Sequence, residues 1–143
     1  MFAIDDALAG VVQSSTQPAL GLIRLAWWRE ALERLDLQPP PPEPRLKAVA
    51  AELLARGVSG AMVAKLEEGW AALLHEEPDM ELVGQRGARL FALGAKLLGA
   101  DDNRLDAAGR LFAYGQLGRR RLASGHRPAE ELRTLARHRF ERR

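Results

Sequence analysis

Residues 18–35 read PALGLIRLAWWREALERL, and this stretch decides the fold. Apolar side chains recur in it at the three- and four-residue spacing of an α-helix. They form two neighbouring stripes, one of Leu20, Ile23, Trp27 and Ala31 and the other of Leu25, Trp28 and Leu32. Because so wide an apolar face is typical of a helix enclosed by its neighbours, we predict a buried helix over 18–35.

Helical spacing continues along the chain, and alternating strand-like segments are absent. Pro39 to Pro42, with Pro44, predict an extended connector over 38–44 inside the domain. The chain length of 143 residues fits a single domain over 1–143. We therefore predict an all-α bundle of six or seven helices, with further helices near 1–12, 44–56, 59–74, 78–99, 101–125 and 128–143.

Capping residues mark several of these boundaries. Ser59 is expected to begin a helix and Gly57 to end one, because serine caps helix N-termini and glycine tolerates the left-handed conformation that often follows a helix. Pro78 with Asp79 begins the next helix, and Gly99 ends it. Glycines inside the predicted helices suggest close helix–helix approach, at Gly84, Gly87, Gly94, Gly115 and Gly118.

Composition excludes several functional classes. The chain has no cysteine, which rules out disulfides, thiolate nucleophiles and cysteine-ligated metals. No apolar run approaches the roughly 18 residues of a membrane span, so no transmembrane segment is expected. Residues 1–10 contain Asp5 and Asp6 but no basic side chain, which predicts neither a secretory signal nor a transit peptide. These features favour a cytoplasmic protein.

The charge is distributed unevenly. Residues 119–143 contain nine arginines and three glutamates, a local charge of +6, whereas residues 1–118 carry −4. This basic C-terminal segment, which includes Arg119 to Arg121, is interpreted as a solvated surface, with an anionic partner as the alternative. Only Phe140 is interleaved with its charges, so nucleic acid is an unlikely partner.

Two early motifs, FAIDDALAGVV at 2–12 and IRLAWWREAL at 23–32, resemble the first helices of the squalene/phytoene synthase family, in a divergent bacterial branch. RGVSG, LEEGWAALL and RGARLFALGAKLLG resemble later helices, and the resemblance extends to about Leu122. It implies an isoprenoid synthase fold, incomplete here because the chain is shorter than active members at both ends. Active members join two prenyl diphosphates head to head, with Mg²⁺ held by two aspartate-rich motifs.

The chain departs from both motifs. If Ile4 takes the aromatic position before the first motif, the metal-binding aspartates fall at Ala9 and Gln13. Between Leu111 and Gly125, where the second motif belongs, there is no acidic residue. Mg²⁺ needs carboxylate ligands to hold a diphosphate, so we predict no catalytic residue, no metal site and no cofactor. Mg²⁺ is expected only if the protein is active.

Candidate substrate-binding residues lie in the second motif. Trp27 and Trp28 are interpreted as core, with a prenyl pocket as the alternative. Arg24 and Arg29 are interpreted as surface partners of nearby glutamates, with phosphate binding as the alternative.

Two acidic groups imitate metal sites. Asp102 and Asp106 are four residues apart, but with Asp101 they fit a helix cap and first-turn acids better. Asp5 and Asp6 point about 100° apart on a helix. They are interpreted as a solvated acidic edge, with a polar role in the former cavity as the alternative.

Three functions remain open at this point. The first is a synthase homologue that is catalytically incompetent alone. The second is a scaffold, resembling a respiratory complex I assembly factor of the same family. The third is an anion-binding module that uses the basic C-terminus. Because Met1 starts directly in a helical pattern, we also expect exposed apolar faces near the ends, leading to self-association, a partner chain or marginal stability.

Overall fold

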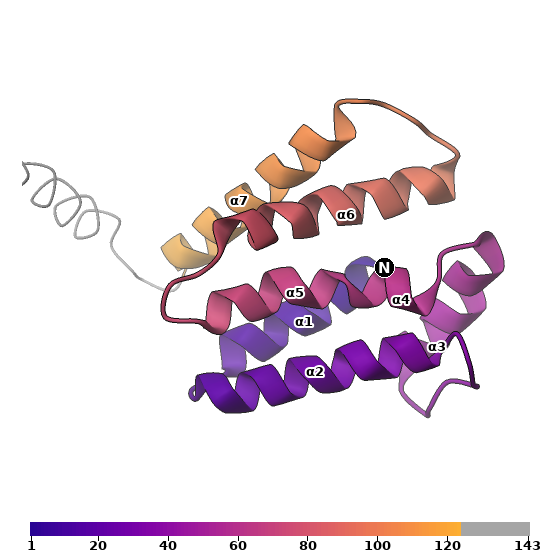
Figure 1. The fold of residues 1–143 in the computed structure, drawn as a ribbon, viewed down its shortest axis with the longest axis horizontal. Coiled ribbons are helices and arrows are strands. Elements are labelled where there is room, and N and C mark those ends of the chain that lie inside the picture. Colours follow the sequence, from indigo (N-terminus) through magenta and orange to yellow (C-terminus); the bar gives the residue numbers. More distant parts are fainter. Residues whose placement is uncertain (124–143) are drawn as a thin grey trace, which may run out of the picture. The chain divides into compact units, whose positions relative to one another are not determined.

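The part of the chain that the structure describes is all-helical, as predicted (Figure 1). The computed structural model describes the backbone of residues 1–123 and the side chains of residues 1–120. Its α-helices are α1 (Phe2–Ser14), α2 (Pro18–Arg34), α3 (Pro44–Ala48), α4 (Gly60–Ala64), α5 (Leu66–Ala71), α6 (Met80–Leu98) and α7 (Leu105–Ala123). The π-helical turn η1 (Val49–Leu53) and the 3₁₀ turn η2 (Leu54–Arg56) continue α3. The 3₁₀ turn η3 (Ala72–Leu74) continues α5.

The predicted start and stop signals are confirmed. Ser59 Oγ accepts a hydrogen bond from the backbone of Met62 at 3.1 Å at the start of α4. Asp79 caps α6 in the same way, accepting from the amides of its first turn at 3.0 and 3.3 Å. Gly57 and Gly99 follow η2 and α6 with φ of 78° and 65°, the left-handed conformation that glycine adopts without a steric cost.

The region from 59 to 74 is broken in a way that the sequence did not indicate. The break falls at Lys65, between α4 and α5. Asp36, just beyond α2, accepts hydrogen bonds from the backbone of Gly60 at 2.6 Å and of Ala61 at 3.0 Å. A side chain at Gly60 would overlap the carbonyl oxygen of Leu32, so the start of α4 lies directly on the end of α2.

The hydrophobic core lies between α1, α2, α5 and α6. Figure 1 shows α5 between α2 and α6, and it contacts both, while α1 runs beside α2 and α5. One apolar cluster joins these helices to α3 and η1. Its most deeply buried members, each at most 1% exposed, include Ile4, Leu8, Leu25, Leu32, Leu46, Leu66 and Leu90.

The prediction that both apolar stripes of α2 are buried between neighbouring helices is right for one stripe and wrong for most of the other. Leu25, Trp28 and Leu32 are buried as expected. The other stripe is mostly exposed, although its fourth member, Ala31, is buried. Its three large side chains are 50–65% exposed, at Leu20, Ile23 and Trp27.

Glycine permits a close crossing of α6 and α7 at one of the predicted positions. A side chain at Gly87 would overlap the carbonyl oxygen of Gly109, and the reverse substitution would overlap Gly87. Gly94 differs, because a side chain there would meet only Met1 Cε at 3.5 Å, an ordinary contact. The prediction of close approach is therefore confirmed for Gly87 and wrong for Gly94. It is also wrong for Gly115, where a side chain would meet only Arg119 Nη1 at 3.9 Å, and for Gly118, where it would meet nothing within 4 Å.

We expect Gly87→Ala to lower the free energy of unfolding by roughly 1–3 kcal/mol, because the added methyl forces two backbones apart. Gly94→Ala, in the same helix, is the matched control and should raise it by up to about 1 kcal/mol through helix propensity. Urea denaturation followed by circular dichroism measures both. Equal effects of the two variants would contradict the close crossing.

The chain divides into two units, residues 1–113 and 114–143. The architecture above is that of the first unit, and in the second the structure describes α7 as far as Ala123. The helix predicted from Pro128 and most of the basic segment 119–143 lie outside the described residues. No helix within residues 1–123 combines the length and the apolar character needed to cross a bilayer.

Candidate functional site

A carboxylate, a guanidinium and an indole meet inside the bundle, from α1, α6 and α5. Arg86 Nη1 donates to Asp5 Oδ2 at 2.7 Å and to Oδ1 at 2.9 Å, and Trp70 Nε1 donates to Asp5 Oδ1 at 2.8 Å. The guanidinium carbon of Arg86 lies 4.1 Å from the centre of the Trp70 ring. All three residues are at most 2% exposed. The cluster is therefore a fully enclosed, charge-compensated junction of three helices.

This junction corrects the interpretation of Asp5 and Asp6 as one solvated acidic edge. Asp6 is exposed, but Asp5 is 1% exposed. The signal in the sequence was its register, since Asp5 lies three and four residues before the buried Leu8 and Ala9 and so shares their face of α1.

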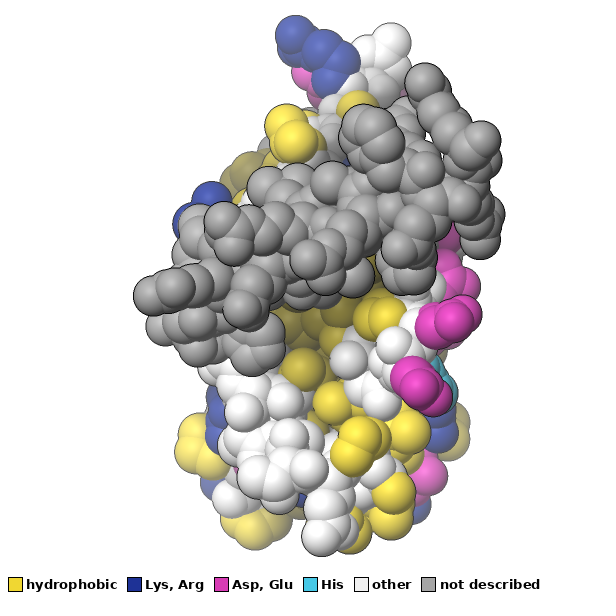
Figure 2. Space-filling view, turned by 90° about the vertical axis from the view of Figure 1, so that its left-hand side faces the viewer, with side chains coloured by type: hydrophobic (Ala, Val, Ile, Leu, Met, Phe, Trp, Pro, Cys, Tyr) yellow, Lys and Arg dark blue, Asp and Glu magenta, His cyan; other side chains and the backbone are white. Residues whose placement is uncertain are grey.

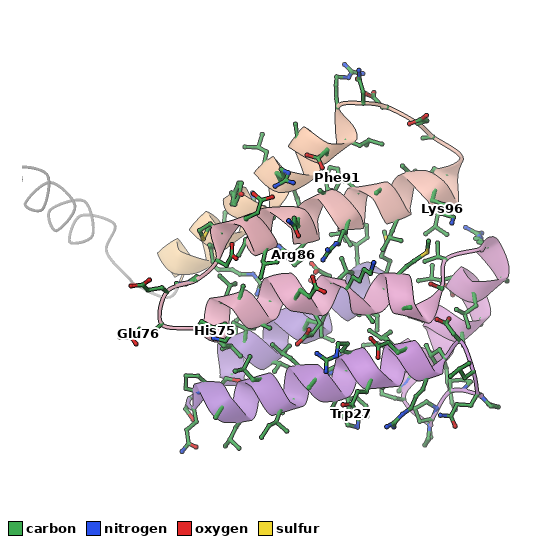
Figure 3. All side chains as sticks on the ribbon, viewed as in Figure 1. Trp27, His75, Glu76, Arg86, Phe91 and Lys96 are labelled. Carbon is green, nitrogen blue, oxygen red and sulfur yellow. The ribbon has the colours of Figure 1, made fainter. Side chains whose placement is uncertain are left out.

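The four candidate residues on α2 do not converge on one site. Trp28 is 8% exposed and packs under Arg45, whose guanidinium carbon lies 5.0 Å from its ring centre. Trp27 lies on the outer side of α2 (Figure 3), edge-on to Trp28 with 5.1 Å between ring centres. The interpretation as core therefore holds for Trp28 and is wrong for Trp27. Arg24 donates to Ser14 Oγ at 3.2 Å rather than to a glutamate.

Arg29 lies on a third side of α2, at a surface hollow of about 390 Å³. Its Nη1 lies 3.9 Å from Oε2 of Glu67 on α5, so it pairs with a glutamate of another helix. Apolar side chains form part of the wall, from Leu22, Ala26, Ala71, Ala72 and Leu82. Polar groups complete it, from Arg29, Glu67, Glu68, His75, Glu77 and Asp79. Figure 3 shows His75 at the end of η3, and acidic side chains gather along one edge of the face in Figure 2.

Glu67 is the buried charge of this hollow. It is 5% exposed, and this burial raises the pKa of its carboxyl above the ordinary glutamate value. Arg29 opposes the rise, and the neighbouring Glu68 and Glu33 add to it. The sequence did not single out Glu67, because in LEEGW it is one of two adjacent glutamates and only the folded chain separates the buried one from the exposed one.

Glu67→Gln should be more stable than the wild type at pH 7. A carboxyl whose pKa is higher in the folded than in the unfolded chain lowers stability as pH rises through the window between the two values. The stability advantage of Glu67→Gln over the wild type should therefore shrink as the pH falls to about 4, where the carboxyl of Glu67 is protonated in the unfolded chain as well. Urea denaturation at both pH values tests this, with the exposed Glu68→Gln as the control for charge. A destabilised Glu67→Gln at pH 7 would mean that the Arg29 pair outweighs the cost of burial.

The aspartates that imitate metal sites have local roles. Asp102 accepts a hydrogen bond from the backbone of Arg104 at 2.8 Å, and bonding from the Arg104 side chain holds the pKa of Asp102 below its ordinary value. Asp106 stands in the first turn of α7 and bonds Arg110 at 2.8 Å. Within the described residues, no three histidine or acidic side chains are grouped so that they could hold a metal ion.

The two positions expected for metal-binding aspartates on α1 have different surroundings. Ala9 is 1% exposed within the apolar cluster, and Gln13 is exposed. No protein-family model, curated protein or solved structure matches the chain, so the resemblance to squalene/phytoene synthases stays a prediction.

Proposed function

We propose that this protein is a non-catalytic squalene/phytoene synthase homologue that acts as a cytoplasmic helical assembly protein. It binds another protein chain and does not transfer prenyl groups. The observation that carries this proposal is the exposed apolar stripe of α2, formed by Leu20, Ile23 and Trp27.

Three features of α1 support the absence of prenyl transfer. Ala9 packs in the apolar core where the resemblance expects a metal ligand, and Gln13 carries no charge. Asp5, the acidic side chain nearest to them that faces inward, bonds Arg86 and Trp70 through both carboxylate oxygens. A diphosphate leaving group needs a cluster of free carboxylates with bound Mg²⁺. This interior offers an apolar core and a neutralised ion pair.

The stripe has the form of a surface that docks on another helix. Leu20, Ile23 and Trp27 follow the spacing i, i+3 and i+7, which places them on one side of α2. Contiguous exposed apolar side chains rimmed by charge mark interaction surfaces, and tryptophan is enriched at their energetic centres. The rim here includes Glu30 and Arg34, which pair at 3.6 Å.

Self-association is the first test, because a second copy is the simplest chain that carries a complementary apolar stripe. We expect the wild type to sediment as a dimer at high micromolar concentration, and Ile23→Asp to remain a monomer with an unchanged helical spectrum. Glu30→Gln, on the rim, is the control and should leave the dimer intact. A monomeric wild type would contradict self-association through α2.

Prenyl transfer is tested separately. Incubation with labelled farnesyl or geranylgeranyl diphosphate and Mg²⁺ should form no squalene or phytoene above a no-protein control. Product that depends on the protein would overturn the non-catalytic proposal.

A further inference from the structure

We propose that the hollow between α2 and α5 binds an organic cation, an alkylammonium group whose stem lies on the apolar wall and whose charge is anchored by Glu67. The hollow lies on a different side of α2 from the exposed stripe, because Leu22, Ala26 and Arg29 are offset from Ile23 and Trp27 around the helix. This inference therefore does not depend on the proposed assembly function.

The shape of the hollow suits a small amphipathic ligand. Its volume of about 390 Å³ lies within the usual range of ligand sites. Leu22 and Ala26 from α2 and Leu82 from α6 give it apolar side chains on which an alkyl stem can lie. Polar side chains complete the lining of the hollow. A ligand with an apolar stem and one charged end therefore matches both the apolar and the polar part of the lining.

Glu67 has hydrogen-bonding capacity that the described residues do not fill. It is 5% exposed, yet Nη1 of its cationic neighbour Arg29 lies at 3.9 Å, beyond hydrogen-bond distance. Buried polar groups in native proteins are nearly always hydrogen-bonded, and an ionised carboxylate accepts up to about four bonds. A donor that enters the hollow would reach an acceptor that is partly desolvated and is held in place by α5.

The remaining charges select a cation. The lining holds four carboxylates, from Glu67, Glu68, Glu77 and Asp79, against the single guanidinium of Arg29. Glu68 is bonded to Arg89 at 2.8 Å, Asp79 caps α6, and Glu77 is exposed, so Glu67 is the buried carboxylate that can serve as the anchor. His75 stands at the rim and is exposed. An anion such as a phosphate would meet this net negative lining before it reached Arg29, so the hollow discriminates against it.

The test is a titration of the full chain with pentylammonium chloride at pH 7, followed by amide chemical shifts. We expect saturable shifts confined to residues 22–29 and 67–82. Neutral pentanol should bind more weakly. Glu67→Gln should weaken pentylammonium binding at least about tenfold, because it removes the charged acceptor. Glu68→Gln, which removes the same charge from the same lining, should change affinity much less.

Two further arms make the outcome decisive. Arg29→Gln removes the cation that competes for Glu67 and should tighten binding. Pentanoate tests the alternative that the hollow binds anions through Arg29. In that case the wild type would bind pentanoate, and Arg29→Gln would not. Preferential pentanoate binding, equal losses in Glu67→Gln and Glu68→Gln, or no shifts with any probe would each overturn the proposal.

Discussion

Asp5→Ala should lower the free energy of unfolding by about 3–5 kcal/mol, whereas Asp6→Ala should change it by no more than about 0.5 kcal/mol. The two residues are adjacent and chemically identical, but Asp5 is 1% exposed and Asp6 is exposed. Removing the Asp5 carboxylate takes away the acceptor of two hydrogen bonds from Arg86 Nη1 and of the hydrogen bond from Trp70 Nε1, all inside the core. Breaking a buried, hydrogen-bonded ion pair is far more costly than removing a solvated carboxylate.

Urea denaturation of the two single variants measures this difference. A double variant, Asp5→Leu with Arg86→Met, distinguishes the lost pair from lost packing. Buried ion pairs are often replaceable by apolar side chains of similar volume, so the double variant should recover most of the stability that Asp5→Ala loses. Similar melting of Asp5→Ala and Asp6→Ala would contradict the enclosed junction of α1, α5 and α6.

Helix boundaries were predictable from the sequence because their causes are local. The cap at Ser59, the cap at Asp79 and the left-handed Gly99 each depend on the backbone within one helical turn. The contact that fixes the start of α4 on the end of α2 was not predictable, because Asp36 binds the backbone of Gly60 from 24 residues away along the chain. Local sequence patterns indicate where a helix can begin, whereas contacts between residues far apart in the chain determine how the helices are positioned against one another.

The candidate site shows the same division between local and distant causes. Arg29 was singled out from the WWRE motif, and the structure places it at the hollow, but its partner Glu67 is on another helix. Periodicity separated Trp28 from Trp27 into different stripes, yet it could not show that only one stripe would be covered. That outcome depends on which helices stand beside α2, and therefore on the tertiary arrangement.

Trp28→Ala should lower the free energy of unfolding by about 3–5 kcal/mol, because it empties a large volume in a packed core. Trp28 is 8% exposed, and the variant also loses the stacking of Arg45 on its ring. Trp27→Ala should cost only about 0.5–1.5 kcal/mol, the usual value of an aromatic pair, because Trp27 is 50% exposed and forms a T-shaped pair with Trp28.

Measuring stability and self-association on the same two variants separates the two roles. We expect Trp27→Ala to weaken the dimer while it melts nearly like the wild type. We expect Trp28→Ala to melt early, and at temperatures where it remains folded its association should be closer to that of the wild type. If both variants melt like the wild type, α2 is peripheral to the core. If Trp27→Ala melts early and associates normally, the outer stripe stabilises the fold and another surface must carry the assembly function, because the same side chain cannot be covered within the chain and available to a partner.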